Sequence, residues 1–214
     1  MRELPKEIPL FPLQRCILVP GCNLPLQLFE PRYLQMYEDL PSAPKVIGII
    51  QPRNEVDSSH PDLYSIGTVG EVIEARTLPN RRYAIVLRGL QRFHLDFEVQ
   101  NQDVLYRKAV VSYDAFSQDM ADEDVPLDRD EFFLLLEKYM KQKKIKIKIH
   151  NIKQIRNFQI VNILSQALPF TTVEKQSLLE VHTHFERMEQ LIAMLTMETS
   201  QYGRISDDQD RFMN

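Results

Sequence analysis

The sequence predicts an α+β protein in which a curled, mostly antiparallel β domain is followed by a bundle of helices. Two patterns indicate this class. Before Phe116, short apolar runs alternate with proline and glycine, whereas after Phe116 apolar residues recur every three to four positions. We therefore expect a β domain at residues 1–117, a helical domain at 118–203 and a flexible tail at 204–214. A chain of 214 residues can bury a sizeable core in one large domain or two small ones.

Prolines punctuate the first elements. Proline fixes φ and offers no N–H to a neighbouring strand, so the proline-containing apolar runs predict short edge strands broken by turns. Pro31 suits the first turn of a helix, and Gly21 suits a turn that needs a positive φ. We expect strands at 8–13, 24–29 and 45–51, and a short helix at 32–40.

A second group of strands follows a polar loop. Valine and isoleucine alternate with polar residues up to Leu78, and Pro79-Asn80 predicts a turn. Gly89 is expected to end the return strand. The expected strands are 65–78, 83–87, 93–99 and 106–113. Such a series of short, meandering strands predicts a curled sheet or small barrel.

The C-terminal half has helical periodicity. Apolar side chains share one face of predicted helices at 128–142 and 152–168. Thr171 and Glu174 have the spacing of a capping box, which predicts the start of a third helix. We expect this helix to be long and continuous, because its apolar residues repeat at a spacing of three to four until Gly203.

Composition narrows the functional classes. A net charge of −4 and a pI near 5.8 argue against a general binder of nucleic acid or anionic membrane, although a local basic patch remains compatible with them. Two cysteines are too few for a disulfide framework. No run approaches the ~18 apolar residues of a membrane span, and the N-terminus lacks the apolar core of a signal peptide. We therefore expect a cytoplasmic protein that does not engage membranes.

Three stretches of the sequence, taken together, resemble the Lon N-terminal domain family. The first comprises PLFPL at 9–13, VPG at 19–21, LPL at 24–26 and LFEPRY at 28–33. The second comprises IGT at 66–68, Gly70, LP at 78–79, Arg82, Leu87, Gly89 and Arg92-Phe93. The third is LPFTTVEKQSLLEV at 168–181. The chain departs from the family pattern at Asn80-Arg81, where Asp-Gly is usual, so the geometry of that hairpin turn is open.

The resemblance implies a fold and an activity. The fold would be a β domain like the PUA pseudo-barrel, followed by a helical bundle with one long helix. The activity would be non-catalytic binding of unfolded or partner polypeptides, including clients of Lon, with no cofactor. None of the six glycines begins the GxxxxGK[ST] phosphate loop that an ATPase motor requires. The implied polypeptide-binding surface is Leu24, Leu26, Leu28, Phe29, Glu30, Arg32 and Tyr33.

Glu30 and Arg32 have two interpretations. They could form the rim of a peptide groove, or they could pair with each other where the strand turns into the helix. The sequence leaves both open.

A nucleic-acid-binding module is the main alternative. Arginines cluster with Tyr83 and Phe93 around the predicted hairpin, and such a mixture can bind single strands by stacking and phosphate contact. The arginines are Arg76, Arg81, Arg82, Arg88 and Arg92. A solvated hairpin whose arginines pair with nearby acidic residues is the simpler interpretation.

An enzyme or a metal protein is not expected. Nucleophilic catalysis needs a nucleophile and a base side by side; Cys16 or Cys22 with His94 could provide them, but nothing in the sequence pairs them. His182 and His184 are two residues apart, so on a helix their side chains would diverge rather than share a metal.

Overall fold

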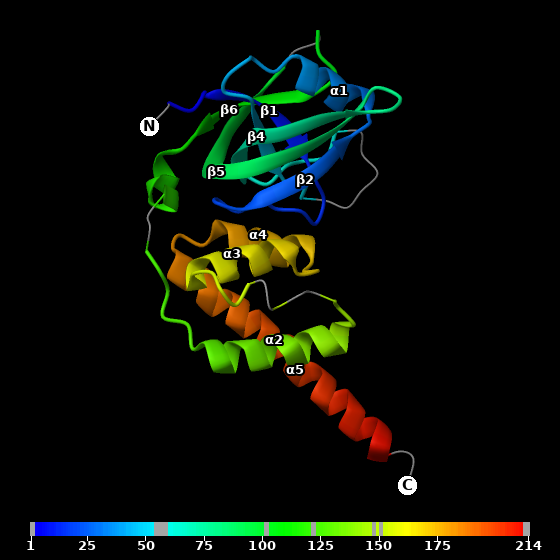
Figure 1. Cartoon of the computed structure of the whole chain (residues 1–214), viewed down its shortest axis with the longest axis vertical. Coiled ribbons are helices and arrows are strands. Elements are labelled where there is room, and N and C mark those ends of the chain that lie inside the picture. The colour runs from blue at the N-terminus through cyan, green and yellow to red at the C-terminus, as the bar shows by residue number, and fades with distance from the viewer. Residues whose placement is uncertain are drawn as a thin grey trace. The chain divides into compact units, whose positions relative to one another are not determined.

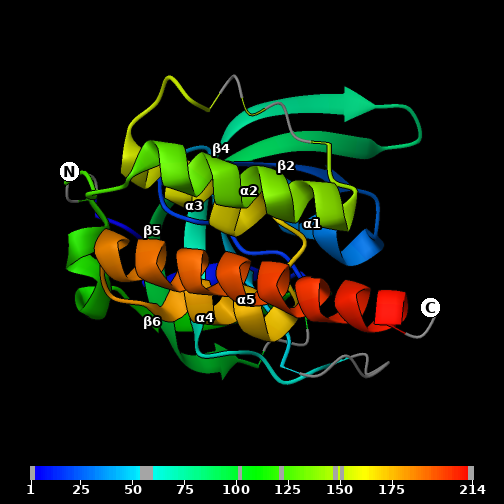
Figure 2. The same cartoon turned by 90° about the horizontal axis from the view of Figure 1, so that it is seen from below.

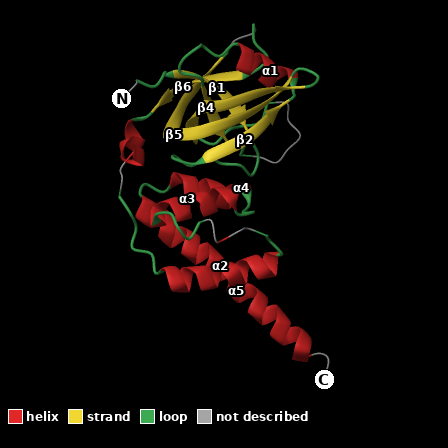
Figure 3. Ribbon diagram, viewed as in Figure 1, coloured by secondary structure: helices red, strands yellow, loops and turns green. Residues whose placement is uncertain are grey.

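The computed structural model describes residues 3–53, 60–100, 103–120, 123–146, 149 and 152–211. Six strands come first along the chain and most helices follow them, which confirms the α+β class (Figure 3). The strands are β1 (Glu7–Pro12), β2 (Asn23–Leu28), β3 (Val46–Ile50), β4 (Ile66–Leu78), β5 (Arg82–Val99) and β6 (Arg107–Ser112). The helices are α1 (Pro31–Glu38), the 3₁₀ segment η1 (Asp114–Met120), α2 (Arg129–Lys143), α3 (Asn157–Ala167), α4 (Thr172–Glu180) and α5 (His184–Arg211).

The six strands form one mixed sheet that closes on itself. Its order is β2-β5-β4-β3-β1-β6, and β6 also pairs with β5 (Figure 1). All pairings between these strands are antiparallel except that of β1 with β3. Because β5 is long, its first half carries β2 while its second half pairs with β6. The curled, mostly antiparallel sheet expected from the sequence is therefore present.

The sequence predicted that Gly89 ends a strand, but in the structure this glycine lies inside β5. Its N–H donates to the Cys22 carbonyl at 2.9 Å, and its own carbonyl accepts from the Gly21 N–H at 2.9 Å. A Cβ at this position would lie 2.5 Å from the Val19 carbonyl oxygen. The glycine is thus explained by the close approach of the 19–22 turn, while β5 continues past it.

The β4–β5 turn keeps a left-handed backbone without glycine. Asn80 and Arg81 have φ values of 61° and 55°. Asparagine tolerates this conformation, whereas arginine is strained in it. The departure from Asp-Gly therefore changes the residues of the turn and retains its positive φ angles.

The chain forms two compact units whose boundaries differ from the expected ones. One unit comprises 1–122 with 162–182, and the other comprises 123–161 with 183–214. Residues 162–182 were expected in the helical part but group with the sheet. Gln51 Nε2, at the end of β3, donates to the Thr172 carbonyl and to Gln176 Oε1, both at 3.0 Å. Helical periodicity identifies an apolar face but not the element it packs against, so the sequence could not assign this segment.

Helix α4 and the second half of α3 contribute to the core of the sheet unit. Leu179 packs in one apolar cluster with Ile17, Val19 and Cys22, and Ile163 lies against the same cluster. Gln166 accepts from the Val19 N–H at 3.0 Å and donates to the Asn23 carbonyl at 2.8 Å. These hydrogen bonds fix the loop that leads into β2.

The helical unit is built on α2 and α5, which pack side by side (Figure 2). Asp128 caps α2 by accepting from the N–H groups of Asp130 and Glu131. Lys143 pairs with Glu198 at 2.6 Å. Among the side chains that the structure describes, those buried on the two helices are Phe132, Phe133, Leu136, Tyr139 and Met140 on α2 and Arg187, Met188, Leu191, Leu195 and Thr199 on α5. No helix in the described part of the chain is both long enough and apolar enough to cross a bilayer.

The prediction of one continuous third helix is wrong, because this part of the chain forms two helices, α4 and α5. Val181 has an extended backbone with a ψ of 146°, so α4 ends before it. Thr183 Oγ1 accepts from the Glu186 N–H at 3.1 Å and starts α5. This Thr-x-x-Glu spacing repeats that of Thr171 and Glu174, and was the missed signal. Helix α5 also continues past Gly203, where it was expected to stop.

Candidate functional site

A groove crosses the outer face of the sheet where β2, β5 and β4 lie next to one another. It encloses about 380 Å³. Its lining comes from three short segments, one on each strand: Pro25, Leu26 and Gln27 on β2, Ala84, Ile85 and Val86 on β5, and Glu74, Ala75 and Arg76 on β4.

Strand register explains why these segments make a groove. On β5, Val86 is paired with Pro25 on one side and Glu74 on the other. Ala84 is paired with Gln27 and Arg76 in the same way. Successive side chains of a strand point to opposite faces, so these residues share the outer face while Ile85 and Leu87 enter the core. The floor is low because Ala84 and Val86 are small.

The side chains around this floor suit a peptide main chain. Gln27 can both donate and accept hydrogen bonds, Glu74 accepts them and Arg76 donates them. An extended polypeptide presents N–H and C=O groups on every residue other than proline. An apolar floor of Ala84 and Val86 would accommodate one or two of its apolar side chains. The volume lies at the lower end of the ~300–1,000 Å³ range of ligand pockets, so only a short segment fits.

Strand β2 is also an edge of the sheet. Among the described strands it pairs with β5 alone. Its outward-facing Pro25 has no N–H to offer to a further strand. The edge therefore provides fewer main-chain hydrogen bonds than an uninterrupted strand would, and the groove on the sheet face is the better developed feature.

The structure places three of the expected site residues in the core. Leu24, Leu28 and Tyr33 are 9%, 0% and 4% exposed. They cannot touch a partner without unfolding, so their assignment to a binding surface is corrected. Leu26 is half-buried and contributes to the groove. The outward residues of β2 are Pro25 and Gln27, which alternate with the predicted leucines. The strand lies where it was predicted, and the residues between the predicted leucines are the exposed ones.

Phe29, Glu30 and Arg32 lie where β2 turns into α1. Phe29 is 59% exposed, and none of the three lines the groove. Arg32 Nη2 pairs with Glu30 Oε2 at 2.7 Å, and the guanidinium lies 4.6 Å from the centre of the Tyr33 ring. Burial raises the pKa of the Tyr33 phenol. Of the two interpretations of Glu30 and Arg32, the ion pair at the helix start is the one observed.

The arginine cluster is divided in the structure. Arg81, Arg82 and Arg88 are exposed on the hairpin, and Arg76 belongs to the groove. Arg92 is only 1% exposed, so it cannot take part in a surface for nucleic acid. Phe93 is fully buried, so no base could stack on its ring. The nucleic-acid alternative therefore gains no support from the geometry.

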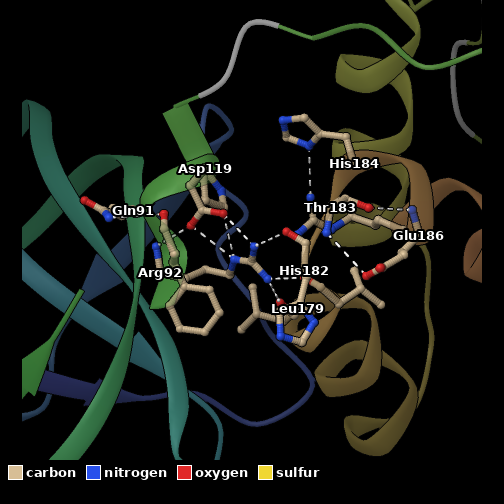
Figure 4. A network of polar contacts seen from close by, with 12 residues as sticks. Gln91, Arg92, Asp119, Leu179, His182, Thr183, His184 and Glu186 are labelled. Atoms are coloured by element: carbon tan, nitrogen blue, oxygen red, sulfur yellow. Dashed lines mark hydrogen bonds and ion pairs between the residues drawn. The ribbon is translucent and has the colours of Figure 1, made fainter. Parts of the chain in front are cut away.

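Arg92 instead organises a buried polar network (Figure 4). Its Nε and Nη2 donate to Asp119 of η1 at 2.9 and 2.6 Å, and its backbone N–H donates to the same carboxylate at 2.8 Å. Its Nη1 donates to the carbonyl oxygens of Leu179, at 2.7 Å, and Val181. The guanidinium also lies 4.4 Å from the centre of the Phe116 ring. One side chain thus ties β5 to η1 and to the C-terminal end of α4, where its positive charge suits the helix dipole.

Cys16 and His94, two of the residues considered for catalysis, lie in different environments. Burial raises the pKa of the Cys16 thiol, which lowers the fraction of reactive thiolate, while the nearby Lys175 opposes this effect. His94 is half-exposed and lies 3.3 Å from Asp96. Within the described residues, no group of three or more histidine, cysteine, aspartate or glutamate side chains could hold a metal ion.

Comparison with known proteins identifies a family. The model of the ATP-dependent protease La (LON) substrate-binding domain matches residues 7–197. Lon protease of Flavobacterium johnsoniae is 26% identical over 98% of this chain, and Lon protease 2 of Myxococcus xanthus is 30% identical over 59%. The chain covers 26% and 15% of these relatives' own lengths, so it spans about a quarter of the first.

Two solved structures share the fold. The crystal structure of a Lon N-terminal domain protein from Xanthomonas campestris has a TM-score of 0.61 at 22% identity, covering 87% of this chain and 97% of that one. The N-terminal domain of the Mycobacterium avium complex Lon protease has a TM-score of 0.60 at 17% identity, covering 91% of this chain and 98% of that one.

Proposed function

The chain belongs to the LON substrate-binding domain family, and we propose that it binds extended segments of unfolded polypeptide in the groove across β2, β5 and β4. Binding is the whole activity in this proposal, without catalysis or a cofactor. The relatives named Lon protease suggest that the bound polypeptides include clients of that protease. The cytoplasm is the proposed location.

The observation that carries this proposal is the cross-strand arrangement of the groove. Ala84 and Val86 form an apolar floor, and hydrogen-bonding side chains from two neighbouring strands stand on either side of it. Such a site reads the main chain and one or two side chains of a peptide, which gives weak sequence preference. Weak preference suits a protein that meets many unfolded chains.

The expected affinity is modest. A groove of 380 Å³ accepts only a short segment, and ordering a flexible chain consumes part of the binding energy. We expect a dissociation constant for a single segment of roughly 10–100 μM. Since the walls carry Glu74 and Arg76, one charge of each sign, salt should change the affinity little.

A fluorescence-anisotropy titration tests the function. The chain is titrated against one labelled polypeptide, in its native form and in a permanently unfolded form, at low and moderate salt. We expect binding to the unfolded form only, with little effect of salt. Binding to neither form would contradict general polypeptide capture. Binding that collapses as salt rises would indicate a charged ligand in place of an extended polypeptide.

A further inference from the structure

Helix α2 of the helical unit presents an apolar surface that its own unit leaves open. Leu134 is 70% exposed, a high value for a leucine in a regular helix. A shallow hollow of about 580 Å³ runs along the same face. The described residues that line it belong to α2: Glu131, Leu134, Leu135, Glu137, Lys138 and Lys141. The opposite face of the helix, with Phe132, Leu136 and Tyr139, is buried.

The open face has a regular pattern. Glu131, Leu134, Leu135 and Lys138 are related as i, i+3, i+4 and i+7, which places them on one side of a helix. Glu131 lies toward the N-terminal end of this set and Lys138 and Lys141 lie toward its C-terminal end, while Glu137 immediately precedes Lys138. Glu131, Lys138 and Lys141 are exposed, and no ion pair within the described part of the chain engages them.

We propose that this face pairs with the same face of a second copy of the chain, the two α2 helices running antiparallel about a two-fold axis between Leu134 and Leu135. In this register Leu134 meets Leu135 of the second copy. Glu131 meets Lys138 of the second copy, and Asp128 meets Lys141. Two-fold symmetry generates each contact twice, so the dimer contains each of these ion pairs two times.

The second copy is favoured as the occupant by this charge pattern. An acidic or basic partner would leave half of the charges on α2 opposed by like charge. An apolar partner would leave Glu131 and Lys138, in the middle of the face, without counter-charges. The face itself, reversed end for end, supplies both leucines and both charge signs in register. This inference concerns α2 alone and does not rest on the groove.

The pairing should be weak. Contact along one helix face falls below the ~1,200 Å² of total buried area typical of stable complexes. We expect a dimer dissociation constant of roughly 10–100 μM at low salt, rising with salt because the charge pairs are exposed.

Charge reversal gives a decisive test by sedimentation velocity of the full chain, from about 10 to 300 μM. The single variants Glu131→Lys and Lys138→Glu place like charges against each other in a homodimer, and each should weaken association by about tenfold or more. An equal mixture of the two variants restores opposite charges at both positions. Its weight-average sedimentation coefficient should therefore exceed that of either variant alone at the same total concentration.

Leu134→Gln with the matched control Leu105→Gln tests the apolar part of the pairing. Leu105 is similarly exposed, at 66%, but lies in the sheet unit. Leu134→Gln should weaken dimerisation and Leu105→Gln should not, while circular dichroism checks that all variants are folded. A wild-type chain that stays monomeric over the whole range would overturn the proposal. So would dimers that tolerate both single reversals, or a mixture that associates no better than its components.

Discussion

Replacing Arg92 by methionine is expected to lower the free energy of unfolding of the sheet unit by about 3–5 kcal/mol. Methionine can fill much of the same space, but it provides no hydrogen bond. The Asp119 carboxylate, 3% exposed, would then be buried without its guanidinium partner. The carbonyl oxygens of Leu179 and Val181 would lose their donor as well. An uncompensated buried charge is among the most costly single changes in a folded protein.

Urea unfolding followed by tyrosine fluorescence measures this loss, because most tyrosines of the chain lie within residues 1–122. Arg88→Met is the matched control. It makes the same chemical change on the same strand at an exposed position, and should alter stability by no more than about 0.5 kcal/mol. Equal effects of the two substitutions would show that Arg92 is not the tie between β5, η1 and α4.

Replacing Ala84 by arginine is expected to weaken binding of unfolded polypeptide by at least about tenfold, or ~1.4 kcal/mol. Ala84 is the floor of the groove between Gln27 and Arg76. A long charged side chain there would fill the hollow and place a second positive charge beside Arg76. The substitution lies on the outer face of β5, so the core should stay packed.

Thr77→Arg controls for the added charge. Thr77 is exposed on β4, next to Arg76 in the chain, and does not line the groove. Both variants are compared with the wild type in the anisotropy titration, after urea unfolding has shown that they remain folded. If Thr77→Arg reduced binding as much as Ala84→Arg, net charge rather than the shape of the groove would govern affinity.

The sequence predicted the elements of the sheet well, because proline, glycine and alternation are local signals. The strands at 8–13, 24–29 and 45–51 lie within a residue or two of β1, β2 and β3. The helices were harder. Leu178 and Leu195 continue one apolar periodicity across Val181, although α4 and α5 are separate helices in different units. Periodicity does not show that one helix ends and another begins near Val181. The Thr183–Glu186 capping pair marks the start of the second helix, and its Thr-x-x-Glu spacing is visible in the sequence.

The groove proposed as the binding site was not predicted from the sequence, for a physical reason. The apolar residues of β2 were predicted to form a binding surface. The apolar side chains of a strand, however, are the ones that usually pack into the core. Leu24 and Leu28 therefore form the core, and Pro25 and Gln27 face outward. Two sequence signals were available: the alternation of Glu74 with Arg76, and the small residue Ala84 between larger neighbours. Only the strand register shows that these parts of β4 and β5 lie next to each other and next to β2.

Methyl NMR of the full chain, with and without a saturating permanently unfolded polypeptide, tests the proposed site most directly. The resonances of Ala84 and Val86 report on the floor of the groove. Val173 and Leu134, 67% and 70% exposed, report on exposed apolar surface elsewhere. We predict that the Ala84 and Val86 methyl resonances shift on binding and that the Val173 and Leu134 resonances do not. Unchanged Ala84 and Val86 resonances at saturation would contradict the groove as the polypeptide-binding site.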